Sequence, residues 1–81
     1  MTSNELREAL AAYAHEAWSG WMNYLLSKST VNEDGSWTVP AASAERWHRQ
    51  MSTPYHLLPE GEKASDRKEA DQMLALFYRL G

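Results

Sequence analysis

Two basic residues in the second half of the chain have the spacing of an anion-binding pair. Lys63 and Arg67 are four residues apart, and Asp66 lies beside Arg67. Residues four apart share one face of a helix, and the planar fork of arginine suits a phosphate group. We expect Lys63 and Arg67 to pair with the phosphates of a ligand. The alternative is a solvated charge run at a helix start, in which Arg67 forms a structural ion pair with Glu16 or with Asp66 of a neighbouring subunit.

Aromatic side chains that could stack on a flat ligand lie in three other stretches. Trp18 and Trp37 are expected to expose their ring faces, and Tyr55 is similar, with a hydroxyl that needs a partner. Stacking of a base on such a face contributes about 1–3 kcal/mol. His15 lies three residues before Trp18 and is a candidate to bond or stack on the same ligand. The alternative for His15 is a structural hydrogen bond to a backbone or carboxylate partner.

Two short runs around these residues resemble a known module. Residues 54–67 read Pro-Tyr-His-Leu-Leu-Pro-Glu-Gly-Glu-Lys-Ala-Ser-Asp-Arg, and residues 14–18 read Ala-His-Glu-Ala-Trp. Both resemble signatures of the RyR domain, a small helical module that is repeated in ryanodine receptors and also found in bacterial and phage proteins. The middle of the chain, residues 29–51, departs from that pattern and lacks the module's Gly-Trp-x-x-Gly segment.

The resemblance implies a helical fold and specific roles for matched residues. It implies that His15 faces a ligand, and that Asp66 orients an arginine or accepts a hydrogen bond from a ribose hydroxyl. The chain as a whole also looks like small phage-type proteins with a Trp-x-x-Trp-Met helix and a Ser-Asp-Arg helix.

The sequence gives little support for catalysis or for a metal or other cofactor. It contains no cysteine, so disulfides and cysteine-ligated metals are excluded. The three histidines lack the spacing of a metal-binding pair. No serine lies in a Gly-x-Ser-x-Gly context. We therefore expect a protein that is not an enzyme and has no cofactor.

The charge and the hydropathy of the chain argue against nucleic acids and membranes as partners. The net charge of −3 argues against general nucleic-acid binding, which depends on many phosphate contacts. No apolar run approaches the roughly 20 residues of a membrane span, and the N-terminus lacks a signal pattern. We expect a cytoplasmic protein without membrane contact, located in the host cytoplasm if it is phage-encoded.

The length predicts one domain over residues 1–81. Hydrophobic residues make up 43% of the chain, which is typical of a folded protein. A chain of 81 residues nevertheless buries only about 60% of its unfolded surface. Because small cores are marginal, we expect a homo-oligomer.

The predicted fold is all-α, with three main helices over about 3–27, 40–51 and 60–80 and a short hairpin or loop at 29–39. Thr2 and Glu5 fit a capping box at the first helix. The Asp34-Gly35 pair, between β-forming residues, is a strong hairpin signal.

Apolar spacing predicts which helix faces are buried. The first helix has one stripe from Leu6 to Tyr24 and a second stripe beside it, which is wider than one partner helix needs. Trp21 and Trp47 are expected in the core. The predicted core stripe of the second helix consists of Ala44, Trp47 and Met51. That of the third consists of Ala70, Met73, Leu74 and Phe77, and Leu80 can extend it.

Two functions from different classes follow. The first is a non-catalytic protein that sequesters a small nucleotide-type signalling molecule, as a phage counter-defence sponge would. Its ligand-binding residues are His15, Trp18, Trp37, Tyr55, Lys63, Asp66 and Arg67. The second is a protein-interaction module that inhibits a host or phage protein by docking through the second apolar stripe of the first helix.

Overall fold

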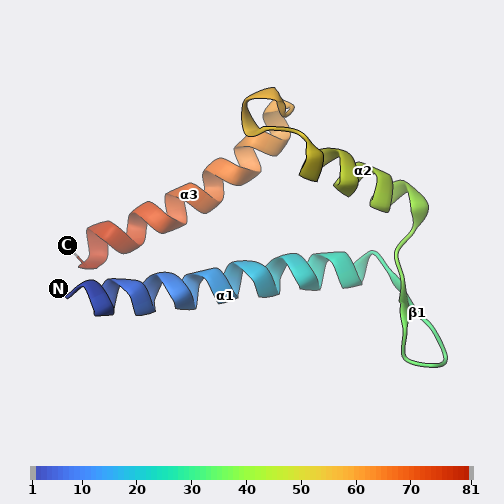
Figure 1. Cartoon of the computed structure of the whole chain (residues 1–81), viewed down its shortest axis with the longest axis horizontal. Coiled ribbons are helices and arrows are strands. Elements are labelled where there is room, and N and C mark those ends of the chain that lie inside the picture. Colours follow the sequence, from blue (N-terminus) through green and yellow to red (C-terminus); the bar gives the residue numbers. More distant parts are fainter. Residues whose placement is uncertain (1, 81) are drawn as a thin grey trace. The chain divides into compact units, whose positions relative to one another are not determined.

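The structure is a computed structural model that describes residues 2–80. Its elements are, in order, α1 (Ser3–Ser27), β1 (Thr30–Val31), β2 (Trp37–Thr38), α2 (Ala41–Ser52), the short 3-10 helix η1 (Tyr55–Leu57) and α3 (Glu60–Leu80). Figure 1 shows these elements in chain order. The prediction of a mostly helical fold, with three main helices and a hairpin between the first two, is confirmed.

Short polar side chains fix both ends of α1. The backbone N–H of Glu5 donates to the Thr2 hydroxyl oxygen at 3.0 Å, as the capping pattern predicts. At the other end, the hydroxyls of Ser27 and Ser29 donate to the carbonyl oxygens of Tyr24 and Leu25 at 2.6 and 2.8 Å. The same two carbonyl oxygens also accept the backbone N–H of Lys28, both at 3.2 Å, so the end of α1 is held by backbone and hydroxyl donors together.

The hairpin forms where the Asp-Gly pair predicts it. Its strands are antiparallel, with Thr30 opposite Thr38 and Val31 opposite Trp37. Gly35 has φ +88°, a conformation that residues with a Cβ rarely adopt. The Asp34 carboxylate accepts bonds from the Ser36 hydroxyl and backbone N–H at 2.6 and 2.9 Å. These bonds lower the pKa of Asp34, chiefly through the hydroxyl.

The chain divides into two compact units. The first contains residues 1–19 and 59–81, and the second contains residues 20–58. The first unit therefore combines the beginning of α1 with α3, whereas the second combines the end of α1, the hairpin, α2 and η1. That the two units make a single domain stays a prediction.

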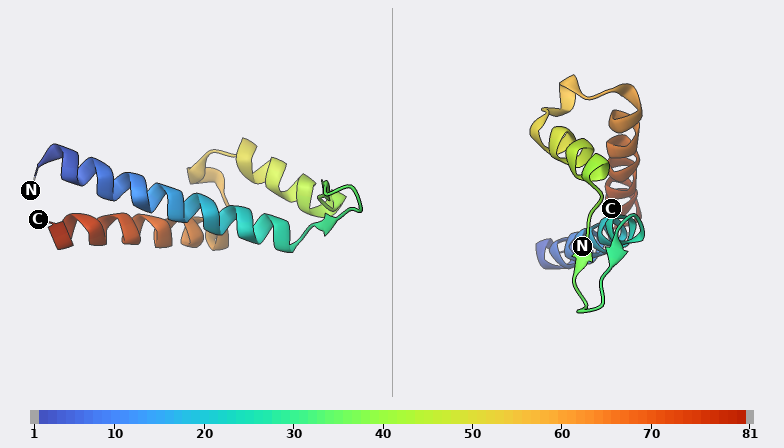
Figure 2. Two further views of the ribbon diagram at one scale, coloured as in Figure 1. Left: turned by 90° about the horizontal axis from the view of Figure 1, so that it is seen from below. Right: turned by 90° about the vertical axis from the view of Figure 1, so that its right-hand side faces the viewer.

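In the first unit, α3 runs antiparallel to the beginning of α1. Figures 1 and 2 show the first turns of α1 beside the last turns of α3. The Tyr13 hydroxyl donates to the Glu69 carboxylate and also lies 3.3 Å from the Glu69 backbone carbonyl oxygen. The bond to the carboxylate, followed by desolvation, raises the pKa of Tyr13 to about 12. A polar clamp thus joins the two helices in a half-buried position.

This clamp determines which side of α3 faces α1. The half-buried residues of α3 include Glu62, Glu69 and Leu76, which are spaced by two helical turns. The predicted core stripe is wrong, because Met73, Leu74 and Phe77 are 44–49% exposed. Apolar spacing alone favoured that stripe, whereas the bond from Tyr13 turns Glu69 inward and the apolar residues outward.

In the second unit, aromatic rings connect the end of α1 to α2. The Tyr24 ring meets Trp21 and Trp47 edge to face, with centroids 6.3 and 6.1 Å apart. Lys28 Nζ lies 5.6 Å from the Tyr24 ring centroid. Trp47 is half-buried, but Trp21 is 49% exposed, so its predicted place in the core is wrong.

The inward face of α2 also differs from the prediction. Its half-buried residues are Ser43, Trp47 and Gln50, while Ala44 is exposed and Met51 is 77% exposed. Trp47 lies at the centre of this face because its ring packs on Tyr24. Among the described residues, Leu58 alone falls in the buried class. The second unit therefore depends on ring contacts such as those of Tyr24 with Trp21 and Trp47, rather than on a filled core.

Replacing Tyr13 by Phe tests the clamp. The ring keeps its packing, but the half-buried Glu69 carboxylate loses a donor, so Y13F should lower the melting temperature by about 5 °C. Thermal unfolding followed by circular dichroism measures this. The control is S65A, at an exposed serine of α3 that makes no part of the clamp, and it should not lower the melting temperature.

The clamp also predicts a loss of stability in alkali. The folded-state pKa of Tyr13 lies above its ordinary value of 10.0, so the folded state favours the neutral phenol. This contribution is present below pH 10 and is lost as the pH rises towards about 12. Y13F should remove that part of the pH dependence. Equal alkaline profiles for the wild type and Y13F would contradict the clamp.

Candidate functional site

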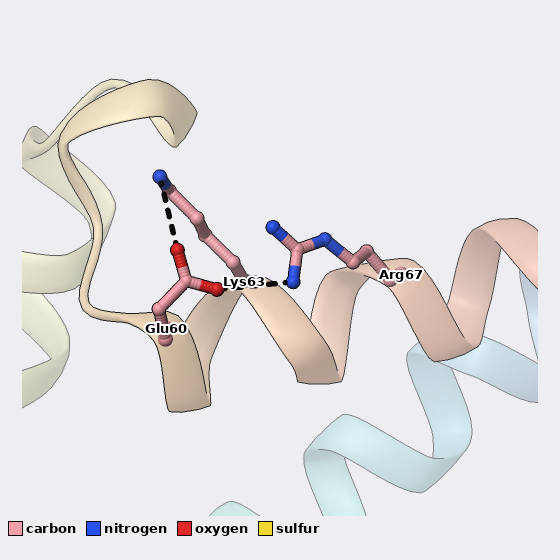
Figure 3. Close-up of polar contacts among 3 residues, drawn as sticks. All are labelled: Glu60, Lys63 and Arg67. Atoms are coloured by element: carbon pink, nitrogen blue, oxygen red, sulfur yellow. Dashed lines mark hydrogen bonds and ion pairs between the residues drawn. The ribbon is translucent and has the colours of Figure 1, made fainter.

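The first turns of α3 hold two cationic side chains around one carboxylate. Lys63 Nζ lies 3.6 Å from Glu60 Oε1, and Arg67 Nη1 donates to Glu60 Oε2 at 3.2 Å. Figure 3 shows the Glu60 carboxylate between the ammonium and the guanidinium groups. The predicted pair, Lys63 and Arg67, therefore shares one anionic group.

The local sequence explains why these residues converge. Glu60, Lys63 and Arg67 are three and four residues apart, so they follow one face of the helix. The Pro59 carbonyl accepts the backbone N–H groups of Glu62 and Lys63, both at 3.0 Å, so Pro59 flanks the helix and the helix begins at Glu60. Glu60 then lies in the first turn, where the helix dipole favours a negative charge.

The electrostatics of the cluster favour an anion between the two cations. The Arg67 hydrogen bond, followed by the charges of Arg67 and Lys63, lowers the pKa of Glu60 below its usual range. The Lys63 side chain is 18% exposed, whereas those of Arg67 and Glu60 are 53% and 76% exposed. Because Glu60 is so exposed, a solvent anion can compete with its carboxylate for the same cations.

Asp66 lies on α3 beside Arg67 and is exposed. Arg67 forms an ion pair with Glu60, on its own helix two turns away. The predicted pairing of Arg67 with Glu16, or with Asp66 of a neighbouring subunit, stays a prediction. The prediction that Asp66 orients an arginine or accepts from a ribose hydroxyl stays a prediction.

His15 and Trp18 form an exposed aromatic pair on α1, in the first unit. Their ring centroids are 6.1 Å apart and the ring planes are inclined by 27°, a stacked arrangement. Trp18 is 60% exposed, which confirms the predicted exposure of its ring. The structural partner of the His15 ring is therefore Trp18, and this pair offers a flat surface to solvent.

The two remaining predicted residues lie in the second unit. Trp37 is in β2, opposite Val31 in the hairpin register, and is 49% exposed as expected. Tyr55 begins η1 and is 47% exposed. Each of them presents an aromatic face, and their part in a ligand site stays a prediction.

Glu60 is the residue that sequence reasoning missed. Glu60 stands three residues before Lys63 and seven before Arg67. Those spacings place all three residues on one helix face, and this was the signal that could have identified the acidic member of the cluster.

No family model, curated protein or solved structure matches the chain. The resemblance to the RyR domain therefore stays a prediction. Within residues 2–80, no helix is both long and apolar enough to cross a bilayer. The same residues contain no group of three or more carboxylate or histidine side chains placed to hold a metal ion.

Proposed function

We propose that the protein binds a small nucleotide-type anion without turning it over. The observation that supports this proposal is the pair of ion pairs at Glu60: Lys63 contacts one oxygen of its carboxylate, and Arg67 contacts the other. A carboxylate held by two cations stands in for a phosphate, whose oxygens accept the same charge-assisted hydrogen bonds. In the bound state, the phosphate takes the place of the Glu60 carboxylate.

The phosphate contact needs a charged group from each basic residue. Arg67 supplies a planar fork that can pair with two phosphate oxygens at once, and Lys63 supplies a compact charge from one turn earlier. Glu60 is three-quarters exposed and can rotate away into water. This exchange costs little, because an exposed ion pair contributes only about 0–1 kcal/mol.

Aromatic side chains support the nucleotide part of the proposal. The stacked His15 and Trp18 rings present a flat surface. A nucleotide base can stack on this surface face to face, as the two rings stack on each other. Asp66, in the same unit, is proposed as an acceptor for a ribose hydroxyl. If the phage-like resemblance holds, the ligand is a host immune nucleotide signal, and tight binding alone removes it from the host.

Removing the Arg67 charge tests the phosphate contact. A pool of 5′-mononucleotides, dinucleotides and cyclic nucleotides is offered to the protein, and native mass spectrometry identifies the one retained. Calorimetry then measures its affinity. R67A should weaken binding about 10- to 100-fold, the loss expected for a hydrogen bond between charged groups. The matched control is K68A, the same type of change at the next residue of α3, which lies about 100° round the helix from Arg67. Equal affinities of R67A and wild type would contradict the contact.

Removing the Glu60 charge should act in the opposite direction. E60Q keeps the size of the side chain but no longer competes for Lys63 and Arg67, so nucleotide affinity should rise about fivefold. The same calorimetric titration measures it. A structural ion-pair cluster without a ligand predicts instead that neither E60Q nor wild type retains any nucleotide of the pool.

A second function is favoured by the exposure of Trp18. A tryptophan that is 60% exposed is typical of a contact residue in a protein interface, where aromatic anchors supply much of the binding energy. On this proposal the second stripe of α1, which includes Ala11, His15 and Trp18, docks on a host or phage protein.

The variant W18E separates the two functions. If α1 docks on a protein, W18E abolishes formation of that complex and leaves nucleotide binding intact. If Trp18 stacks a base, W18E weakens nucleotide binding by about tenfold or more. Binding of the retained nucleotide, measured with wild type and W18E, decides between them.

A further inference from the structure

The C-terminal half of α3 is apolar on more sides than one partner helix can cover. Residues 73–78 read Met-Leu-Ala-Leu-Phe-Tyr, so every position in more than one turn is apolar apart from the Tyr78 hydroxyl. At about 100° per residue, the apolar arc from Leu76 round to Tyr78 spans about 200°. A helix that packs on one neighbour needs a stripe of about 100°.

Within the first unit, α1 covers only one edge of that arc. Leu76 is half-buried, in line with Glu69 and its bond to Tyr13. The four residues on the rest of the arc are exposed: Met73 44%, Leu74 49%, Phe77 45% and Tyr78 81%. We call these four residues the outer face of α3.

We propose that the outer face of α3 pairs with the same face of a second copy of this chain, in a symmetric antiparallel dimer centred near Leu74. Doubling a two-helix unit in this way forms a four-helix bundle, an arrangement with short interhelix distances and a shared core. A short chain that fills little core by itself gains one through such pairing.

The exposed apolar area of the outer face supplies about half of what a dimer of this kind requires. Taking about 200 Å² for each whole side chain, the outer face contributes about 400 Å² from each copy. This is about half of the roughly 800 Å² that each partner buries in a standard interface. The flanking polar side chains of α3 can supply the remainder.

The charge pattern of α3 favours a copy of the same chain in the antiparallel direction. The charged cluster Glu60–Arg67 and the outer face lie on the same side of α3, one in its first turns and the other in its last. Antiparallel pairing around Leu74 brings apolar residues onto apolar residues at the axis. It also places the two charged clusters at opposite ends of the interface, where they stay in water. The dimer does not depend on the proposed anion site.

Sedimentation equilibrium of the wild-type chain at micromolar concentration is the first test, and a dimer is expected. L74E places a charge at the axis and should raise the dimer dissociation constant at least 100-fold. The matched control is Q72E, the same charge on the opposite side of α3, which should stay dimeric. Circular dichroism checks that both variants remain helical.

Single-cysteine variants keep the test decisive if L74E fails to fold. The chain has no cysteine, so L74C and Q72C each carry one thiol. Under mild oxidation L74C should form a disulfide-linked dimer at least tenfold faster than Q72C. A monomeric wild type overturns the proposal and leaves the outer face to a different protein. A dimer that L74E does not weaken, or equal cross-linking of the two cysteine variants, overturns the assignment of this face.

Discussion

The bond from the Tyr13 hydroxyl to the Glu69 carboxylate is the constraint on which the first unit depends. It joins α1 to α3 and fixes the rotation of α3 about its own axis. With Glu69 turned inward, Glu62 and Leu76 follow at intervals of two turns. The apolar residues Met73 and Phe77, which would make a better hydrophobic seam, then face outward. A half-buried polar contact has taken the place of apolar packing.

This rotation gives the outward side of α3 two parts with different chemistry. The first turns carry Lys63 and Arg67 around Glu60, a group suited to anions. The last turns carry the outer face, which is suited to another apolar surface. Both parts lie on one helix but in different turns. Single substitutions can therefore alter ligand binding and self-association separately. The two proposals are linked only through the orientation of α3.

Local signals in the sequence predicted the elements well. The Thr2 cap and the Asp34-Gly35 turn act within a few residues, so the start of α1 and the position of the hairpin followed from neighbouring residues. The helix faces were harder to predict. Apolar spacing indicates that a stripe exists but not which neighbour covers it, and a distant polar partner such as Tyr13 can reverse the choice. Met73 was misplaced for this reason, whereas Met51 was misplaced because the Trp47 ring, packed on Tyr24, sets the inward face of α2. In the candidate site, the spacing of Lys63 and Arg67 predicted a shared anion, whereas the missed Glu60 supplies that anion from within the same helix.

The rotation of α3 can be observed directly by nuclear magnetic resonance. Nuclear Overhauser contacts are measured from the Tyr13 ring protons and from the Leu74 methyl protons in a sample that mixes isotope-labelled and unlabelled copies. Contacts from Tyr13 to Glu69 within one copy, together with contacts from Leu74 to the outer face of another copy, are the predicted result. Contacts from Tyr13 to Met73 and Phe77 within one copy would contradict the account, because they would place the apolar stripe of α3 against α1.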